Sequence, residues 1–211
     1  MTKRPWVTSF VFDRRGLLYA AIGAILPALK AGPAGAAEEI GSVQEVKGDA
    51  FAEADGRRRN LERSAPLFLK DIVATGPEAR LVLHLGSATT LQLGASARLT
   101  IDRFLVNVGG DITLQSGPIL FDRPEDSAPV DMQFHSSFGL IAVRGTRFFA
   151  GPSAGVFGVF VARGVVTVSA AGIEVVVRAG EGTNIPLMGG APSTPTPWGA
   201  ERIRNAMQSV Q

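Results

Sequence analysis

Short runs in which every second residue is apolar dominate this chain from Ile40 onward. Successive side chains of a β-strand point to opposite faces, so Leu81, Leu83 and Leu85 share one face of a predicted strand. The same spacing recurs in four pairs: Leu91 and Leu93, Leu99 and Ile101, Val106 and Val108, and Ile112 and Leu114. Because helices would require a spacing of three or four, the pattern predicts an all-β domain, to which we assign residues 38–188.

Turn residues separate these runs at nearly even intervals. Asp55-Gly56 is the strongest two-residue hairpin signal, and glycine clusters follow at 86–87, 94–96 and 109–111. Residues 156–161 (VFGVFV) and 173–178 (IEVVVR) are apolar on both faces and predict strands that are covered on both sides. Short strands at this spacing fit a β-sandwich or a β-solenoid-like stack, and periodicity does not distinguish the two.

The first 37 residues have the layout of a cleavable signal peptide. Arg14-Arg15 precedes thirteen mostly apolar residues, 17–29, and a small-residue run ends at Ala37. The pair of arginines is compatible with twin-arginine export and with an ordinary secretory signal. Because a bilayer span needs about 20 apolar residues, we expect the segment to be removed, leaving no integral membrane segment and a periplasmic or secreted protein.

Composition narrows the classes of partner. The chain has net charge +2, but its first 37 residues hold five basic residues and one acidic residue, so the remainder carries 16 and 18 and a net charge of −2. A basic surface for nucleic acid is therefore not expected. The chain has no cysteine, which excludes disulfides, thiolate metal sites and a thiol nucleophile.

The C-terminal residues differ in composition from the β-rich part. Residues 189–197 (GGAPSTPTP) predict a linker, and residues 198–211 predict a short amphipathic helix. Its apolar stripe begins beside Trp198 and would dock either on its own domain, the favoured interpretation, or on a partner, with Trp198 as a contact.

A set of motifs spread over residues 41–186 resembles the FecR domain family. The most specific element is VRGTRF at residues 143–148, followed by VFVARGVVTVS. The other matching positions are Leu61, Asp71-Ile72, Thr75-Gly76, Ala79, Leu81, Leu83, Gly86-Ser87, Leu91, Leu93, Gly117 and Phe138-Gly139.

The resemblance implies a β-rich, solenoid-like periplasmic module that acts in protein–protein signalling or envelope binding and has no catalytic activity. Full regulators of this family carry a cytoplasmic anti-sigma segment and a membrane helix before the domain. Here only thirteen residues precede the arginine pair, so we expect the extracytoplasmic module to be the shared part. A protein partner is expected first, and an envelope polysaccharide second.

Arg144 interrupts an apolar strand and is followed by Gly145, Thr146 and, after one residue, Phe148. We favour a structural role in which Arg144, largely removed from water, is held by a carboxylate or turn carbonyls and Thr146 caps the kink. The alternative is a ligand or partner contact. The basic run Arg57, Arg58 and Arg59 at the predicted hairpin is a solvated tip facing Glu53, Asp55 and Glu62, or a contact for a partner.

No residue pattern predicts catalysis, a cofactor or a metal. His84 and His135 lack partners at ligand spacing, and Ser136 beside His135 lacks a nucleophile elbow. No glycine-rich phosphate loop is present. The favoured function is an exported non-enzymatic module for protein interaction, signalling or scaffolding at the cell envelope, and the alternative is a secreted glycan-active or hydrolytic enzyme.

Overall fold

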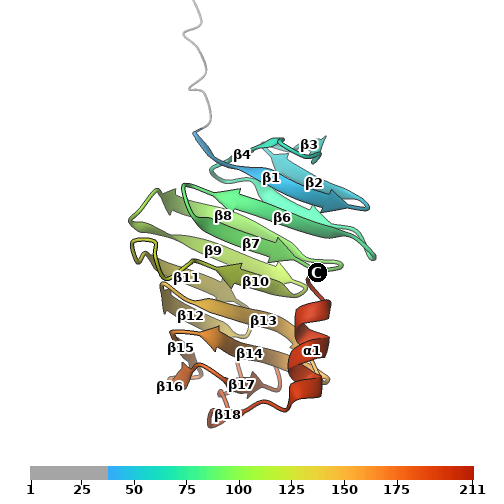
Figure 1. The fold of residues 1–211 in the computed structure, drawn as a ribbon. Coiled ribbons are helices and arrows are strands. Elements are labelled where there is room, and N and C mark those ends of the chain that lie inside the picture. Colours follow the sequence, from blue (N-terminus) through green and yellow to red (C-terminus); the bar gives the residue numbers. More distant parts are fainter. Residues whose placement is uncertain (1–37) are drawn as a thin grey trace, which may run out of the picture. The chain divides into compact units, whose positions relative to one another are not determined.

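A computed structural model describes residues 38–211 of the chain; the predicted signal peptide at residues 1–37 lies outside the described residues. Two nine-stranded sheets face each other across an apolar core, and one helix, α1 (Ala200–Gln208), lies against the first sheet (Figure 1). In spatial order, sheet A consists of β18 (Thr196–Pro197), β17 (Glu181–Ile185), β14 (Val156–Arg163), β13 (Arg147–Ser153), β10 (Ile119–Asp122), β7 (Thr89–Leu93), β6 (Arg80–Leu85), β1 (Glu39–Lys47) and β4 (Pro66–Phe68). Sheet B consists of β16 (Ile173–Arg178), β15 (Val165–Ala170), β12 (Gly139–Arg144), β11 (Asp131–Ser136), β9 (Gly109–Ser116), β8 (Arg98–Leu105), β5 (Ile72–Thr75), β2 (Ala50–Ala54) and β3 (Arg57–Asn60).

The chain alternates between the sheets as it advances. The β6–β7 hairpin in sheet A is followed by β8–β9 in sheet B, and the later hairpins β11–β12, β13–β14 and β15–β16 alternate likewise. Strand β10 crosses sheet A alone, and therefore β11 runs parallel to β9 while the other paired strands are antiparallel. The fold is thus a two-layer sandwich in cross-section and a stack of hairpins along the chain, which confirms the all-β prediction.

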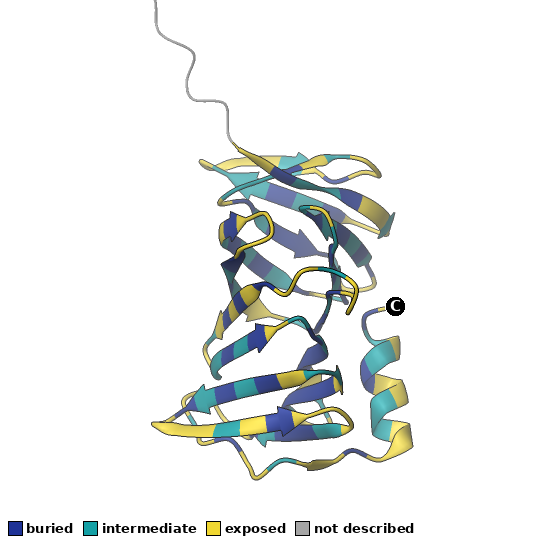
Figure 2. Cartoon of the chain, turned by 60° about the vertical axis from the view of Figure 1, so that its left-hand side comes forward, coloured by how far each residue is buried: buried dark blue, intermediate teal, exposed yellow. Residues whose placement is uncertain are grey.

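The core lies between the sheets, where the alternating apolar residues meet. Leu81, Leu83 and Leu85 of β6 are fully buried, and the intervening His84 is half-buried on the outer face. Figure 2 shows the same alternation of buried and more exposed residues along the neighbouring strands. The period-two prediction is therefore confirmed for the leucine runs. It is wrong for Val106 and Val108, which lie exposed in the β8–β9 turn.

Three phenylalanines join the two sheets at mid-stack. Phe121 of β10 and Phe148 of β13 come from sheet A, and Phe134 of β11 comes from sheet B. The Phe134 ring lies 5.3 Å from that of Phe121 and 5.1 Å from that of Phe148, both edge to face. Edge-to-face rings add to the stabilisation from apolar burial, so this cluster couples the sheets where β10 interrupts the hairpin pattern.

The two strands predicted to be covered on both faces behave differently. Strand β14 is buried on both faces because α1 covers the outer side of sheet A. For β16 the expectation is wrong: Ile173 and Val176 are 49% and 42% exposed. The reason is its position, since β16 is the last strand of sheet B: no described element covers Val176 on its outer side, and Ile173 lies at the end of the strand beside the turn.

The segment predicted as a linker is held against sheet A. Thr196–Pro197 pairs with β17, and the Thr183 hydroxyl donates a 2.6 Å hydrogen bond to the carbonyl of Ser193. Helix α1 begins at Ala200, two residues after the predicted start at Trp198, and Gly199 is its N-cap. The buried side of the helix packs on sheet A. The favoured docking of the helix on its own domain is confirmed.

Replacing Phe134 by alanine should lower the free energy of unfolding by about 3–5 kcal/mol, because it leaves a cavity between two rings that cannot close it. Urea unfolding monitored by circular dichroism measures the change. Leu105→Ala is the control, since this side chain is 49% exposed, and it should change stability by less than about 0.5 kcal/mol. Equal losses in the two variants would contradict a packed inter-sheet core.

Candidate interaction surface

Arg144 is exposed, which corrects the expectation of a guanidinium withdrawn from water. Its side chain is 71% exposed, and its Nε lies 3.7 Å from a carboxylate oxygen of Asp131 on neighbouring β11, itself 79% exposed. The alternation of β12 explains the placement: Val143 points into the core, so Arg144 points outward. An exposed pair of this kind contributes little to stability.

Gly145 and Thr146 form the crossover from sheet B to sheet A. Gly145 has φ +62°, a left-handed conformation that favours glycine. Thr146 is fully buried, but its hydroxyl makes no hydrogen bond with the described residues, so the expected hydroxyl cap is absent. Its carbonyl instead accepts a 3.0 Å hydrogen bond from the backbone N–H of Arg123. The VRGT motif therefore determines the crossover through the backbone conformation of Gly145 and the burial of Thr146.

The buried arginine is Arg123, at the end of β10. The residue is 2% exposed and donates hydrogen bonds to the Ala128 carbonyl at 2.7 Å, the Thr89 hydroxyl at 2.9 Å and the Asn107 side-chain oxygen at 3.4 Å. Within residues 38–211 no carboxylate forms an ion pair with it. Loss of solvent lowers the pKa of its guanidinium. Arg123 thus links the β10–β11 loop to Thr89 at the start of β7 and to Asn107 in the β8–β9 turn.

Arg163 fastens the start of the same loop. Its Nη2 donates to the Arg123 carbonyl at 2.7 Å and to the Asp122 carboxylate at 2.8 Å. The sequence pattern did not single out this corner, because Arg123 falls in a polar segment that is typical of a solvated loop. The available signal was a pair of charged residues, Asp122 and Arg123, directly after the fully apolar run 119–121.

The basic tip at β3 is more engaged than predicted. Arg59 forms an ion pair with Asp71, which is fully buried, and stacks over the ring of Phe68 at 5.2 Å. Arg58 lies 3.4 Å from the centre of the Phe51 ring. The predicted acidic neighbours do not include Asp71, because it is twelve residues from Arg59 and only the sheet pairing brings them together.

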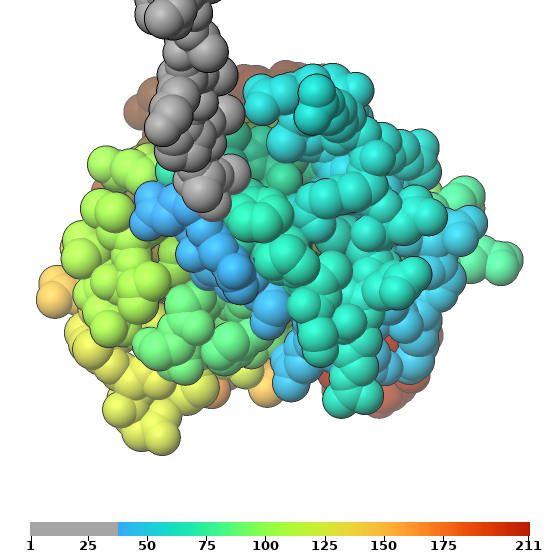
Figure 3. All heavy atoms as spheres, turned by 90° about the horizontal axis from the view of Figure 1, so that it is seen from above, coloured from blue at the N-terminus to red at the C-terminus, as the bar shows by residue number. Residues whose placement is uncertain are grey.

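Arg57 and Arg58 nevertheless remain exposed at the end of the stack. Figure 3 looks onto this end, where the blue to turquoise residues of the first strands cover the core. Arg59 is therefore a structural residue, whereas Arg57 and Arg58 stay candidates for contact with a partner.

Trp198 is not available to a partner. The residue is 7% exposed and stacks on Phe160 at 5.2 Å, beneath the guanidinium of Arg202 at 3.6 Å. A Cβ atom at Gly182 would lie 2.2 Å from the indole nitrogen, so glycine is required for this close approach. The prediction of a partner contact at Trp198 is wrong because the indole anchors α1 to its own sheet.

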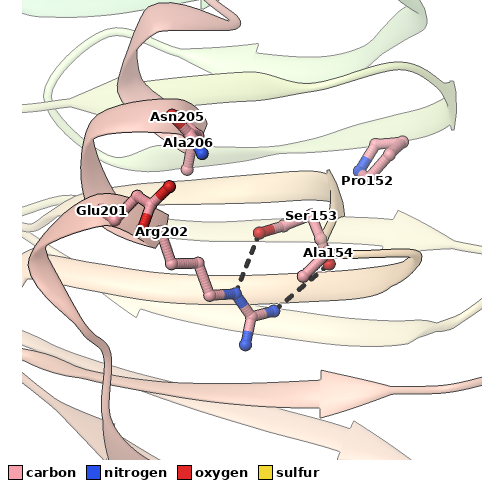
Figure 4. Close-up of a pocket in the computed structure, with 7 residues that line it drawn as sticks. All are labelled: Pro152, Ser153, Ala154, Glu201, Arg202, Asn205 and Ala206. Carbon is pink, nitrogen blue, oxygen red and sulfur yellow. Dashed lines mark hydrogen bonds between the residues drawn. The ribbon is translucent and has the colours of Figure 1, made fainter.

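The pocket beside α1 is lined by an arginine whose hydrogen bonds hold the helix against sheet A (Figure 4). It measures 350 Å³ and lies between the helix and the β13–β14 turn. The Arg202 guanidinium that lines it donates to the Ser153 hydroxyl at 3.0 Å and to the Asn184 side-chain oxygen at 2.7 Å. Its charged group is thus already engaged in holding the helix.

The residues with catalytic or ligand chemistry do not converge. His84 lies on the outer face of sheet A and His135 on the outer face of sheet B. The Ser136 hydroxyl is used in its own hairpin turn, where it bonds the Gly139 carbonyl at 3.1 Å. In the part of the chain that the structure describes, no three histidine or acidic side chains form a metal-binding group. None of the described helices is long and apolar enough to cross a membrane.

Sheet B presents a broad polar surface, which we call the open face. It consists of the outward residues of β8, β9, β11 and β12, which are polar except for Leu140 and Ala142: Arg98, Thr100, Asp102, Arg103, Asp111, Thr113, Gln115, Asp131, Gln133, His135, Leu140, Ala142 and Arg144. None of these side chains is buried, and cross-strand bonds such as Gln115 to Thr100 at 2.7 Å hold neighbouring rows together. The open face is therefore a polar surface that cross-strand hydrogen bonds hold in order.

Removing the buried arginine should destabilise the protein far more than removing the motif arginine. Arg123→Ala leaves the Ala128 carbonyl and two side-chain oxygens without their donor, so the free energy of unfolding should fall by about 3–5 kcal/mol. Arg144→Ala should change it by less than about 1 kcal/mol. Chemical denaturation of both variants measures the difference. A larger loss for Arg144→Ala than for Arg123→Ala would contradict the assignment of Arg123 as the residue that holds the β10–β11 loop.

Comparison with known proteins is consistent with this geometry. Residues 71–167 match the family model described as FecR protein. Two crystal structures of a proposed anti-sigma factor from Parabacteroides distasonis ATCC 8503 share the fold, each with a TM-score of 0.54 and 14% identity. The alignments cover 65% of this chain and 64% of that protein, which is just under two thirds of its length. No curated protein matches the sequence. The match spans the VRGT crossover and the Arg123 corner, and the chain contains a FecR domain.

Proposed function

We propose that this chain is an exported, non-enzymatic module that binds another protein at the cell envelope and serves in signalling or scaffolding. The open face of sheet B is the single observation that carries this proposal. It is polar, ordered by cross-strand bonds and uncovered, whereas the comparable face of sheet A is occupied by α1. An ordered surface of this kind binds without the entropy cost of ordering loops.

The predicted signal peptide and the FecR domain support the envelope location. Proteins outside the cytoplasm that lack disulfides must be stabilised by packing, and the core between the two sheets supplies it. The protein of similar fold from Parabacteroides distasonis is described as a proposed anti-sigma factor, which favours a regulatory rather than a metabolic role. A protein partner is the first expectation, and an envelope polysaccharide is the second.

The rival prediction, a secreted glycan-active or hydrolytic enzyme, has no observation in its favour among residues 38–211. Such an enzyme requires two carboxyl groups facing a cleft, or a nucleophile within reach of a base. The acidic residues of the open face are instead paired with basic or hydroxyl groups of neighbouring strands, as Asp111 is with Arg103 at 2.8 Å.

Export predicts a shortened protein in the envelope fraction. N-terminal sequencing of the protein from fractionated cells should find a start near Ala37 or Glu38, because the small-residue run ends there. Mutation of Arg14 and Arg15 to lysine should block export only if the twin-arginine route is used. An intact Met1 on protein recovered from the cytoplasm would remove the export proposal.

Partner binding should depend on the open face. The double variant Gln133→Lys/His135→Lys places two charges on one side of β11 and should reduce the partner recovered from envelope extracts about tenfold, equivalent to about 1.4 kcal/mol. Quantitative mass spectrometry of the captured proteins measures the change. Thr90→Lys/Gln92→Lys is the matched control, since these residues have the same spacing on the outer side of β7.

The control variant should recover the same partner as the unaltered protein. Arg57→Ser/Arg58→Ser tests separately whether the basic tip contributes, without disturbing the Arg59–Asp71 pair. Equal recovery with the open-face variant and its control would contradict the proposal.

A further inference from the structure

The described part of the fold has four sheet edges, and three of them are blunted by devices that prevent further strand pairing. Edge strand β3 carries Arg57, Arg58 and Arg59, β4 has three residues and begins with Pro66, and β18 has two residues and ends with Pro197. Charge, shortness and proline each protect an exposed edge. The fourth edge, β16, has six residues and no proline.

The β16 edge also exposes apolar side chains beside its charged residues Glu174 and Arg178. Val176 on its outer side is 42% exposed, and Ile173 at its start is 49% exposed. Val165, on the outer side of adjacent β15, is 50% exposed. A regular edge strand that exposes apolar side chains is a template for pairing with another strand.

The β15–β16 turn determines which backbone groups point out of this edge. Ala171 and Gly172 form a two-residue turn with φ +50° and +75°, and Ala170 is paired with Ile173 across it. In such a hairpin the residues that flank the turn bond each other, and bonded positions then alternate. The N–H and C=O groups of Glu174, Val176 and Arg178 therefore point away from β15 toward the free edge.

These three residues form a self-complementary set. In an antiparallel pairing centred on Val176, each Glu174 lies opposite Arg178 of the second copy, and the two Val176 side chains meet on the axis. The residues placed in hydrogen-bonded pairs are those whose backbone groups point outward. Opposite charges across such pairs are favourable, and like charges are unfavourable.

We propose that β16 pairs antiparallel with β16 of a second copy of this chain, about a two-fold axis through Val176. The pairing joins the two B sheets into one continuous sheet and leaves both open faces uncovered. One native contact competes with it locally: the Arg178 N–H donates to a carboxylate oxygen of Glu181 at 2.9 Å. The central bonds at Val176 and the carbonyl of Arg178 remain available. Self-association is separate from partner binding, since β12 and β15 lie between β11 and β16.

Charge reversal tests the register directly. Sedimentation equilibrium of the purified protein from about 1 to 100 μM should detect a monomer–dimer equilibrium, the range expected of a small interface. Glu174→Arg alone and Arg178→Glu alone each create two like-charge pairs and should weaken the dimer about tenfold. A mixture of the two variants should form heterodimers, because every facing pair then has opposite charges.

Val176→Lys should abolish the dimer by bringing two lysines together on the axis. Val108→Lys is the control, because this valine is also exposed, at 63%, but lies in the β8–β9 turn, and three strands separate β9 from β16. Both variants should retain the thermal midpoint of the unaltered protein in circular dichroism, which separates loss of pairing from loss of folding.

Three outcomes would overturn the proposal. These are a monomer at every concentration, a dimer that survives Val176→Lys, and a mixture of the charge variants that stays as monomeric as each alone. A monomer that loses its envelope partner on Val176→Lys would instead identify β16 as the edge for a strand of another protein.

Discussion

Burial of two apolar sheet faces against each other is the interaction on which the rest of this structure depends. Neither sheet can remove its alternating leucines, valines and phenylalanines from water alone, because each strand places them on one face only. The chain satisfies both sheets at once by alternating hairpins between them. Each added hairpin then extends the same core rather than starting a new one, so the fold can lengthen without a closed boundary.

Alternation between the sheets requires crossovers, and buried polar residues lie at these connections. At the VRGT crossover the backbone turns through Gly145, and Thr146 is buried without a hydroxyl partner among the described residues. Opposite it, Arg123 donates hydrogen bonds to the Ala128 carbonyl of its own loop, to the Thr89 hydroxyl and to the Asn107 side-chain oxygen, and so holds a loop that the strands cannot pair. A buried guanidinium is costly to desolvate, so its role is to specify one loop geometry rather than to add stability relative to an apolar residue.

The two sheets differ in what covers their outer faces, and this asymmetry organises the proposed interactions. Sheet A is covered at mid-stack by α1, which is anchored by Trp198 against glycines that permit close contact. Sheet B keeps a polar open face and, at β16, a regular edge strand without proline that exposes a valine between two opposite charges. The surface for a partner and the edge for a second copy thus belong to the same sheet but to different strands.

Much of the fold follows from the local alternation of apolar and polar residues, because alternate residues of a strand face opposite sides and the apolar ones face the core. The leucine runs, the Asp55-Gly56 hairpin and the amphipathic helix were predictable for this reason. Position within a sheet is a non-local property. The apolar runs at β14 and β16 look alike in sequence, but one is covered by a helix from the C-terminus and the other lies at an edge.

The same limit applies to the charged residues. Alternation along the strand places Arg144 opposite the inward-facing Val143, but only the tertiary structure decided that the outer face of β12 stays uncovered and that Arg144 faces solvent. Only the tertiary structure placed Arg123 between turns that lie far from it in the sequence, and Asp71 beside Arg59. Alternation along a strand is encoded by neighbours in the chain, whereas burial of a charge is decided by whichever distant segment supplies its hydrogen-bond partners.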